Sequence, residues 1–131
     1  MVNNFELFSD AKATARLSKR NKEERLKTTR EAFEAQPDSL DCAISYADAL
    51  FDSHHLDEAL EVLMHAEKLA KDSPEVLYNL AFLLNLQGET EKAGKYFRRV
   101  IKLSKGQSLA KSAEYELWRM GEKMEAKWMK R

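Results

Sequence analysis

The sequence predicts an all-α protein built from repeated pairs of helices, and three observations support this fold class. The 131 residues include only 4 Gly and 2 Pro, fewer than a turn-rich all-β fold would need. Apolar residues recur at spacings of three and four, which is typical of one face of an α-helix. An apolar pattern also recurs after 34 residues, so the helices are expected to come in similar pairs.

The first element is expected to be one long helix from Ser9 to Ala35. Ser9 or Asp10 would cap its N-terminus, and Pro37 would stop it because proline cannot continue a helix. The segment is rich in Lys and Arg, so residues 1–38 are predicted to form an N-terminal extension that acts as a partial repeat and solvated cap. Its sparse apolar residues are Leu17, Leu26 and Phe33.

Residues 39–131 are expected to form the repeat domain, with units at about 40–73, 74–106 and 107–131. The first helices of two units share one pattern, because Ala43-x2-Tyr46-Ala47-x2-Leu50 recurs as Leu77-x2-Leu80-Ala81-x2-Leu84. A second apolar stripe begins at Ala59 in the first unit and at Ala93 in the second. Turns are predicted at residues 52–55 and 87–89. Small residues would let the helix backbones approach closely, and large ones would fill the gaps between layers.

The third unit is weaker and shifts the period to 33 residues, with Ala110, Ala113 and Leu117 in the positions of the first helix. Its second helix is expected to be truncated, since the sequence stops at Arg131. An apolar stripe should close this end of the stack, because a repeat array needs its last unit covered. The stripe consists of Leu109, Ala113, Leu117, Met120, Met124 and Trp128.

This helix–turn–helix period, with its small and large positions, resembles the tetratricopeptide repeat (TPR). Ala59, Ala93 and Phe97 match the TPR pattern directly, whereas Ala43 and Leu77 replace its leading aromatic residue. The resemblance covers about residues 39–131. It implies an α-α solenoid, a right-handed superhelix of about three repeats with terminal capping helices.

The resemblance also implies a non-catalytic protein-interaction module, an adaptor or assembly chaperone whose first helices line a concave groove. A segment or helix of another protein would bind there, anchored by aromatic rings and bonded through its backbone by two asparagines. Acidic residues would select basic side chains, so the partner is expected to be neutral to basic and partly apolar. The expected groove residues are Ile44, Asp48, Phe51, Asp52, Tyr78, Asn79, Phe82, Asn85, Leu86, Lys111, Tyr115, Trp118 and Arg119.

One known version of the TPR groove does not fit this sequence. Some TPR proteins hold the acidic tail of heat-shock chaperones with a clamp of Lys, Asn, Asn, Lys and Arg. The corresponding positions here are Ile44, Asp48, Asn79, Ser108 and Ser112, so only Asn79 agrees. Because Asp48 would repel a carboxylate, no carboxylate clamp for heat-shock chaperones is expected.

The formal net charge is zero, but the charges are unevenly spread. Residues 38–75 carry 2 basic and 10 acidic side chains, and residues 76–131 carry 12 basic and 6 acidic ones. A nucleic-acid partner is disfavoured because the acidic middle would repel it, although the basic helix at Lys92–Lys105 leaves phosphate contacts open as an alternative. Membrane-surface docking by the basic C-terminal helix is a second disfavoured alternative. Self-association through exposed aromatic rings, giving a homo-oligomer, is a third.

No enzyme activity, metal or cofactor is expected from the sequence. His54, His55 and His65 lack the spacing of metal ligands, and Cys42 is a lone cysteine that would pack as a small apolar residue. The chain also has no glycine-rich phosphate-binding loop. Neither a signal peptide nor a membrane span is recognisable, so a soluble protein of the reducing cytoplasm is predicted.

Overall fold

The architecture comes from a computed structural model that describes the backbone of residues 4–121 and the side chains of Arg16 and residues 18–121. Residues 4–121 form six α-helices and no strand, which confirms the all-α class. The helices are α1 (Asn4–Ala35), α2 (Leu40–Asp52), α3 (Leu56–Leu69), α4 (Pro74–Leu86), α5 (Thr90–Leu103) and α6 (Ser108–Arg119).

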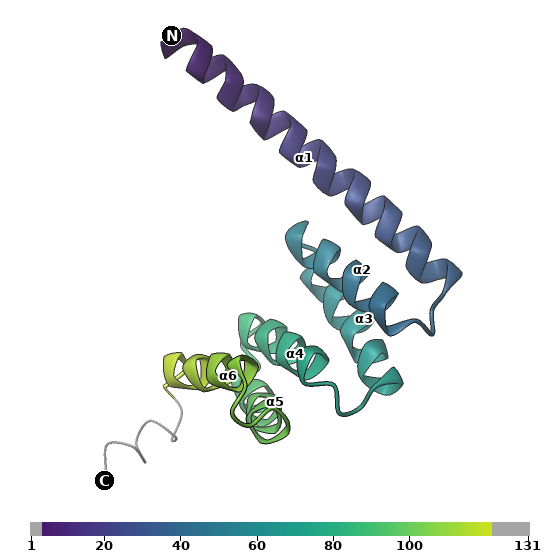
Figure 1. Ribbon diagram of the computed structural model, residues 1–131, viewed down its shortest axis with the longest axis vertical. Helices are drawn as coiled ribbons and strands as arrows, with labels where there is room; N and C mark the ends of the chain where they lie inside the picture. The colour runs from purple at the N-terminus through teal and green to yellow at the C-terminus, as the bar shows by residue number, and fades with distance from the viewer. Residues whose placement is uncertain (1–3, 122–131) are drawn as a thin grey trace.

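The helices pack mainly against their neighbours in the chain, as expected for a stack of helix pairs. The pair α2–α3 recurs 34 residues later as the pair α4–α5, with the same helix lengths and the same loop length. α4 also contacts α6, the first helix of the next unit. Figure 1 shows these pairs following one another, while the N-terminal half of α1 extends beyond the end of α2.

The first helices of both pairs begin with the same N-cap. The hydroxyl oxygen of Ser39 accepts a hydrogen bond from the backbone N–H of Cys42 at 3.3 Å. The hydroxyl oxygen of Ser73, 34 residues later, accepts one from the N–H of Val76 at 3.4 Å. Each cap satisfies an N–H that has no partner inside the helix. Pro74 follows at the first helical position, where its missing N–H costs nothing.

The helix α1 begins earlier than the sequence predicted, at Asn4 rather than at Ser9 or Asp10. The prediction was wrong because Ser and Asp are preferred caps but do not force a helix to start. No Gly or Pro lies between Asn4 and Asp10, so nothing interrupts the helix there. The end at Ala35 agrees with the stop expected from Pro37.

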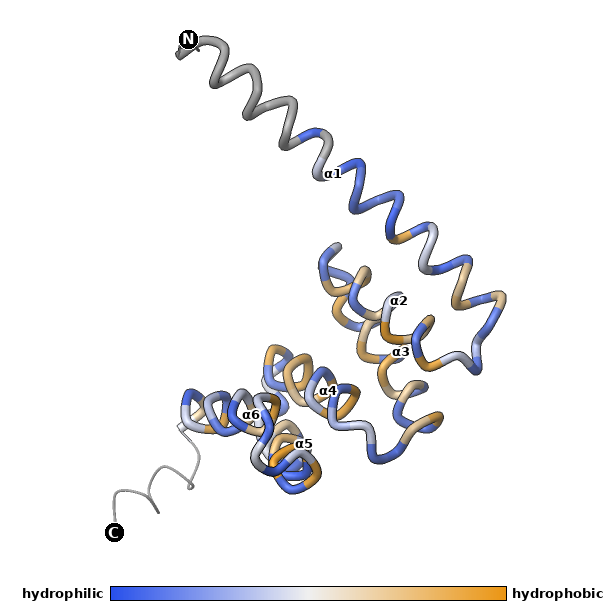
Figure 2. Tube along the Cα trace, viewed as in Figure 1, coloured by the Kyte–Doolittle hydropathy of each residue, from blue (hydrophilic) through white to orange (hydrophobic). Residues whose placement is uncertain are grey.

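The core divides into two clusters that share α4. The first joins α2, α3 and α4, and α1 covers it with the half-buried side chains of Leu26 and Phe33. The second joins α4, α5 and α6 around Phe97, the largest fully buried side chain. Leu60 and Tyr96 pack against both clusters. Figure 2 shows the apolar positions gathered on α2 to α6, whereas the coloured part of α1, from residue 18 onward, is mainly hydrophilic.

The third unit keeps the 33-residue spacing predicted for it. Its buried residues Ala110, Ala113 and Leu117 correspond to Leu77, Leu80 and Leu84 of α4, which are also buried. Met124, Trp128 and the predicted short final helix lie outside the described residues. Within the described part of the chain, each helix is too short or too polar to cross a lipid bilayer.

Candidate functional site

The candidate site is a groove of about 430 Å³ between α2 and α4, called here the inner groove. Its floor is apolar, with side chains from α2, α3 and α4, and polar groups lie around it. Six of the groove residues predicted from the sequence line it: Ile44, Asp48, Phe51, Tyr78, Asn79 and Phe82. The other lining residues are Arg25, Ser45, Ala47, Leu63, Glu75 and Leu83.

Three half-buried aromatic rings hold the two walls of the inner groove in place. Phe51 of α2 and Phe82 of α4 meet edge to face, with ring centroids 5.9 Å apart. Tyr78 of α4 meets the buried ring of Phe97 in the same way at 5.5 Å. These contacts fix the rings from one side, because each packs against the core, and they leave part of each ring open to the groove. Fixed aromatic rings are favoured anchors for a bound side chain, since little side-chain entropy is lost on binding.

The hydroxyl of Tyr78 has a raised pKa. Burial of its hydroxyl raises the pKa of Tyr78 above its usual value, and the nearby carboxylate of Glu116 on α6 raises that pKa further. Arg119 acts in the opposite direction. Tyr78 is therefore a neutral hydroxyl at physiological pH, available as a donor at the edge of the groove.

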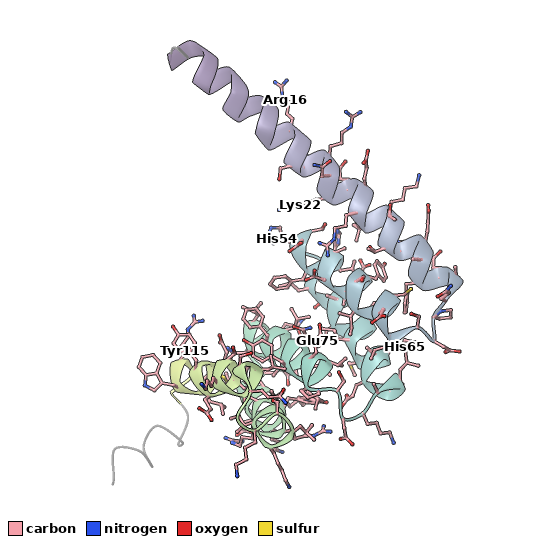
Figure 3. All side chains as sticks on the ribbon, in the orientation of Figure 1. Arg16, Lys22, His54, His65, Glu75 and Tyr115 are labelled. Atoms are coloured by element: carbon pink, nitrogen blue, oxygen red, sulfur yellow. The ribbon has the colours of Figure 1, made fainter. Side chains whose placement is uncertain are left out.

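Asn79 and Glu75 are polar side chains of the inner groove that have no partner among the described residues. Asn79 is half-buried, and its amide forms no side-chain hydrogen bond with the rest of residues 18–121. Glu75, at the start of α4, is exposed and forms no ion pair within that part of the chain. Figure 3 shows the Glu75 side chain on α4. An amide and a carboxylate beside an apolar floor can bind a peptide backbone and a cation, respectively.

The acidic pair expected to select basic side chains already holds a cation of this chain. Arg25 of α1 reaches across to α2 and donates to Asp48 at 2.6 Å and to Asp52 at 2.7 Å. The two carboxylates lie one helical turn apart, which suits the fork of a guanidinium group. The hydrogen bond to Asp48 is the main cause that raises the pKa of Arg25 above its usual value.

Sequence reasoning missed Arg25 as a groove residue. The spacing of Asp48 and Asp52 was a usable signal, because an acidic pair one turn apart favours a bound arginine. Residues 1–37 carry eight basic side chains, however, and only the packing of α1 on α2 decides which one reaches the pair. Leu26 and Phe33 set that packing, and Arg30 adds a hydrogen bond to the Tyr46 hydroxyl at 3.1 Å.

The remaining predicted groove residues do not line the inner groove. Asp52 binds Arg25, Asn85 is half-buried near the end of α4, and Leu86 and Lys111 are exposed. Tyr115 and Trp118 lie on α6, where their rings stack at 5.9 Å and are 56% and 50% exposed. Arg119 lies over the Tyr115 ring at 5.8 Å. Figure 3 shows Tyr115 near the C-terminal end of α6, away from Glu75.

Two of the three histidines contact neighbouring groups in the described part of the chain. His65 lies edge to face with Phe33 at 5.6 Å, and its Nε2 is 2.7 Å from the carbonyl oxygen of Pro37. His55 lies 3.7 Å from Glu58. Among the residues that the structure describes, no three His, Cys, Asp or Glu side chains are grouped so as to hold a metal ion.

Comparison with known proteins decides the type of repeat. The tetratricopeptide repeat family model matches residues 74–107, which span α4, α5 and the loop that follows. Residues 74–107 are a tetratricopeptide repeat. The TPR resemblance seen in the sequence is thereby confirmed for this unit. No curated protein sequence matches the chain.

Solved structures extend the TPR fold over most of the chain. The type III secretion translocator chaperone SycD of Yersinia enterocolitica has a TM-score of 0.72 and 12% identity over 92% of this chain and 87% of its own. PcrH, in complex with the chaperone binding region of PopD, has a TM-score of 0.69 and 13% identity, with coverage of 90% and 92%. The first TPR of Spaghetti (RPAP3), bound to an HSP90 peptide, has a TM-score of 0.68 and 16% identity, with coverage of 87% and 90%. At these identities the likeness shows a shared fold and nothing more.

Proposed function

We propose that this chain is a non-catalytic protein-interaction module that binds a segment of a partner protein in the inner groove. The observation that carries the proposal is the combination of fixed aromatic rings with an amide, Asn79, that has no partner among the described residues. Structures with the same fold support it, because PcrH and the Spaghetti (RPAP3) repeat were solved with peptides of other proteins bound. The role would be that of an adaptor or assembly chaperone.

The inner groove also defines the chemistry of the segment. Apolar side chains would cover Phe51, Tyr78 and Phe82, and the backbone would bond to the Asn79 amide. One cation and two carboxylates line the groove, so a neutral-to-basic segment is favoured over an acidic one. A basic side chain of the partner would bind Glu75, or would compete with Arg25 for Asp48.

The test uses peptides selected from a phage-displayed random library against the wild-type protein, with binding measured by fluorescence anisotropy. Asn79→Ala should weaken the binding of the selected peptides about fivefold, because a hydrogen bond made on binding contributes about 1 kcal/mol. The matched control is Asn85→Ala, since Asn85 is also half-buried on α4 but does not line the inner groove. Circular dichroism would check that both variants stay folded.

Two outcomes would contradict the proposal. One is unchanged binding by folded Asn79→Ala, and the other is a loss caused by Asn85→Ala alone. A second variant tests the charge preference, because Glu75→Gln should weaken only those selected peptides that contain Lys or Arg. Tyr78→Ala is less informative, since the ring also packs on Phe97 and its removal would destabilise the fold.

A further inference from the structure

A second groove of about 560 Å³ lies between α3 and α5 and is called here the outer groove. It shares no lining residue with the inner groove. On α4 the two grooves use different sides of the helix, because residues 80 and 84 are turned well away from residues 75, 79 and 82 at 100° per residue. Its volume is in the range of about 300–1,000 Å³ that is usual for binding sites.

The floor of the outer groove is apolar and partly open. Leu60, Leu80, Leu84 and Tyr96 form it, and Met64 of α3 stands at its edge with 51% of its surface exposed. Tyr96 is held from two sides. Its hydroxyl donates to a carboxylate oxygen of Glu67 at 3.2 Å, and Arg99 lies over its ring at 5.8 Å. An exposed flexible methionine beside a fixed aromatic ring is a surface suited to another apolar side chain.

The rim of the outer groove is basic, in contrast to the inner groove. Three cations and one carboxylate line it: Lys92, Lys95, Arg99 and Glu89. Lys92 lies 3.4 Å from Glu89, and Arg99 lies 3.5 Å from Glu67 and 3.6 Å from Asp72. Lys95 forms no ion pair with the residues that the structure describes. Lys95 is therefore the cation of this rim that a carboxylate of a partner would pair with.

The apolar and basic residues form two stripes that each follow a helix. Leu60 and Met64 are four residues apart on α3, and Lys92, Lys95 and Arg99 are three and four residues apart on α5. An amphipathic helix with an acidic flank carries complementary stripes at the same spacing, which is the usual pattern of a helix bound in a groove.

We propose that the outer groove is a second docking site, which binds an acidic amphipathic helix of a partner protein. Apolar side chains of that helix pack on Met64 and Tyr96, and its acidic side chains face Lys92 and Lys95. The site does not depend on the inner groove. The two grooves share no lining residue and prefer partners of opposite charge, so the two sites are proposed for different segments.

The test uses two synthetic amphipathic helices as probes. Both have the same leucine stripe, flanked by Glu in one peptide and by Lys in the other. The Glu-flanked helix should bind the full chain, as measured by fluorescence anisotropy, and should bind more weakly as salt is raised. Met64→Glu and Lys95→Glu should each reduce its affinity about tenfold.

Matched controls separate this site from a general effect of charge. Lys102→Glu and Leu103→Glu change a basic and an apolar residue of α5 that do not line the outer groove, so both should leave binding intact. Asn79→Ala should also leave binding of the Glu-flanked helix intact. This result would separate the test of the outer groove from the test of the inner groove. Circular dichroism checks the fold of each variant.

Three results would overturn the proposal. The first is equal loss in Lys102→Glu and Lys95→Glu, which would indicate unspecific attraction to α5. The second is equal binding of the Lys-flanked helix. The third is a dimer of this chain in sedimentation that Met64→Glu dissociates, because a second copy would then occupy the groove.

Discussion

At the scale of single residues, the loops inside the two helix pairs have the same geometry but different residues. His54 has a φ of 64° and Gly88, 34 residues later, has a φ of 85°. The backbone hydrogen bonds match as well. The N–H of His54 donates to the Phe51 carbonyl and that of Gly88 to the Asn85 carbonyl, both at 3.0 Å. The first loop thus has a histidine where the second has a glycine, and a side chain is strained in this left-handed region.

Replacing the strained histidine should stabilise the protein. We expect His54→Gly to raise the free energy of unfolding by about 1 kcal/mol, because glycine adopts a positive φ without steric cost. Gly88→Ala is the reverse test. A Cβ there would meet no atom within 4 Å, so any loss of stability comes from the backbone conformation. Urea unfolding would measure both, and an unchanged midpoint for His54→Gly would contradict the strain at this loop.

The raised pKa of Tyr78 predicts a loss of stability in alkali. Since the pKa is higher in the folded state, the stabilisation is fully present below about pH 10 and is lost as the pH rises through the folded pKa. Tyr78→Phe keeps the ring on Phe97 but removes the hydroxyl, so its stability should fall less between neutral and alkaline pH. Tyr115→Phe, on an exposed ring, is the control. If the free energy of unfolding fell equally with pH in the wild type and in Tyr78→Phe, the raised pKa of Tyr78 would not be the cause of the loss.

The sequence predicted the aromatic rings of the inner groove and its Asp48 carboxylate, but not the Arg25 guanidinium that binds this carboxylate. Phe51, Tyr78 and Phe82 follow from helical spacing within one repeat, which is local information. The position of Arg25 depends on how α1 lies on α2, and no repeat precedes α1 to fix that register. Tyr115 was grouped with the other rings by the same repeat logic, but it lies outside the inner groove.

At the scale of elements, the helix boundaries are encoded by short signals. Ser39 and Ser73 start the first helices, and Pro37 marks the end of α1. The pattern predicted both loops within the helix pairs, because their positions follow from the 34-residue period. It failed at the start of α1, where nothing in the sequence interrupts the helix.

An N-cap substitution should show how much one such signal contributes. Ser73→Ala removes the acceptor for the N–H of Val76 and should lower the free energy of unfolding by about 1 kcal/mol. Ser112→Ala is a matched control in the interior of α6, where the exposed hydroxyl bonds only to the Ser108 carbonyl. That control should be neutral or slightly stabilising, because alanine is the better helix former. Equal losses in the two variants would show that the Ser73 cap has no special role.

At the scale of the whole molecule, each helix of the stack packs mainly on the helices next to it in the sequence. Apart from the α4–α6 contact, the principal contacts join helices that follow one another, and the core splits into two clusters. Stability in such a stack is the sum of local terms and of the contacts between neighbours. A local substitution should therefore act mostly on the cluster that contains it.

Hydrogen exchange measured after one substitution in each cluster tests whether the effect stays within that cluster. Phe33→Ala removes the α1 ring that packs on Tyr46 at 5.5 Å and should accelerate amide exchange mainly in α1 to α3. Leu117→Ala opens the second cluster, costs about 3 kcal/mol, and should accelerate exchange mainly in α5 and α6. Mass spectrometry of the exchanged peptides would separate these patterns. Equal acceleration in all helices for both variants would instead mean that Leu60 and Tyr96, which pack on both clusters, couple them into one cooperative unit.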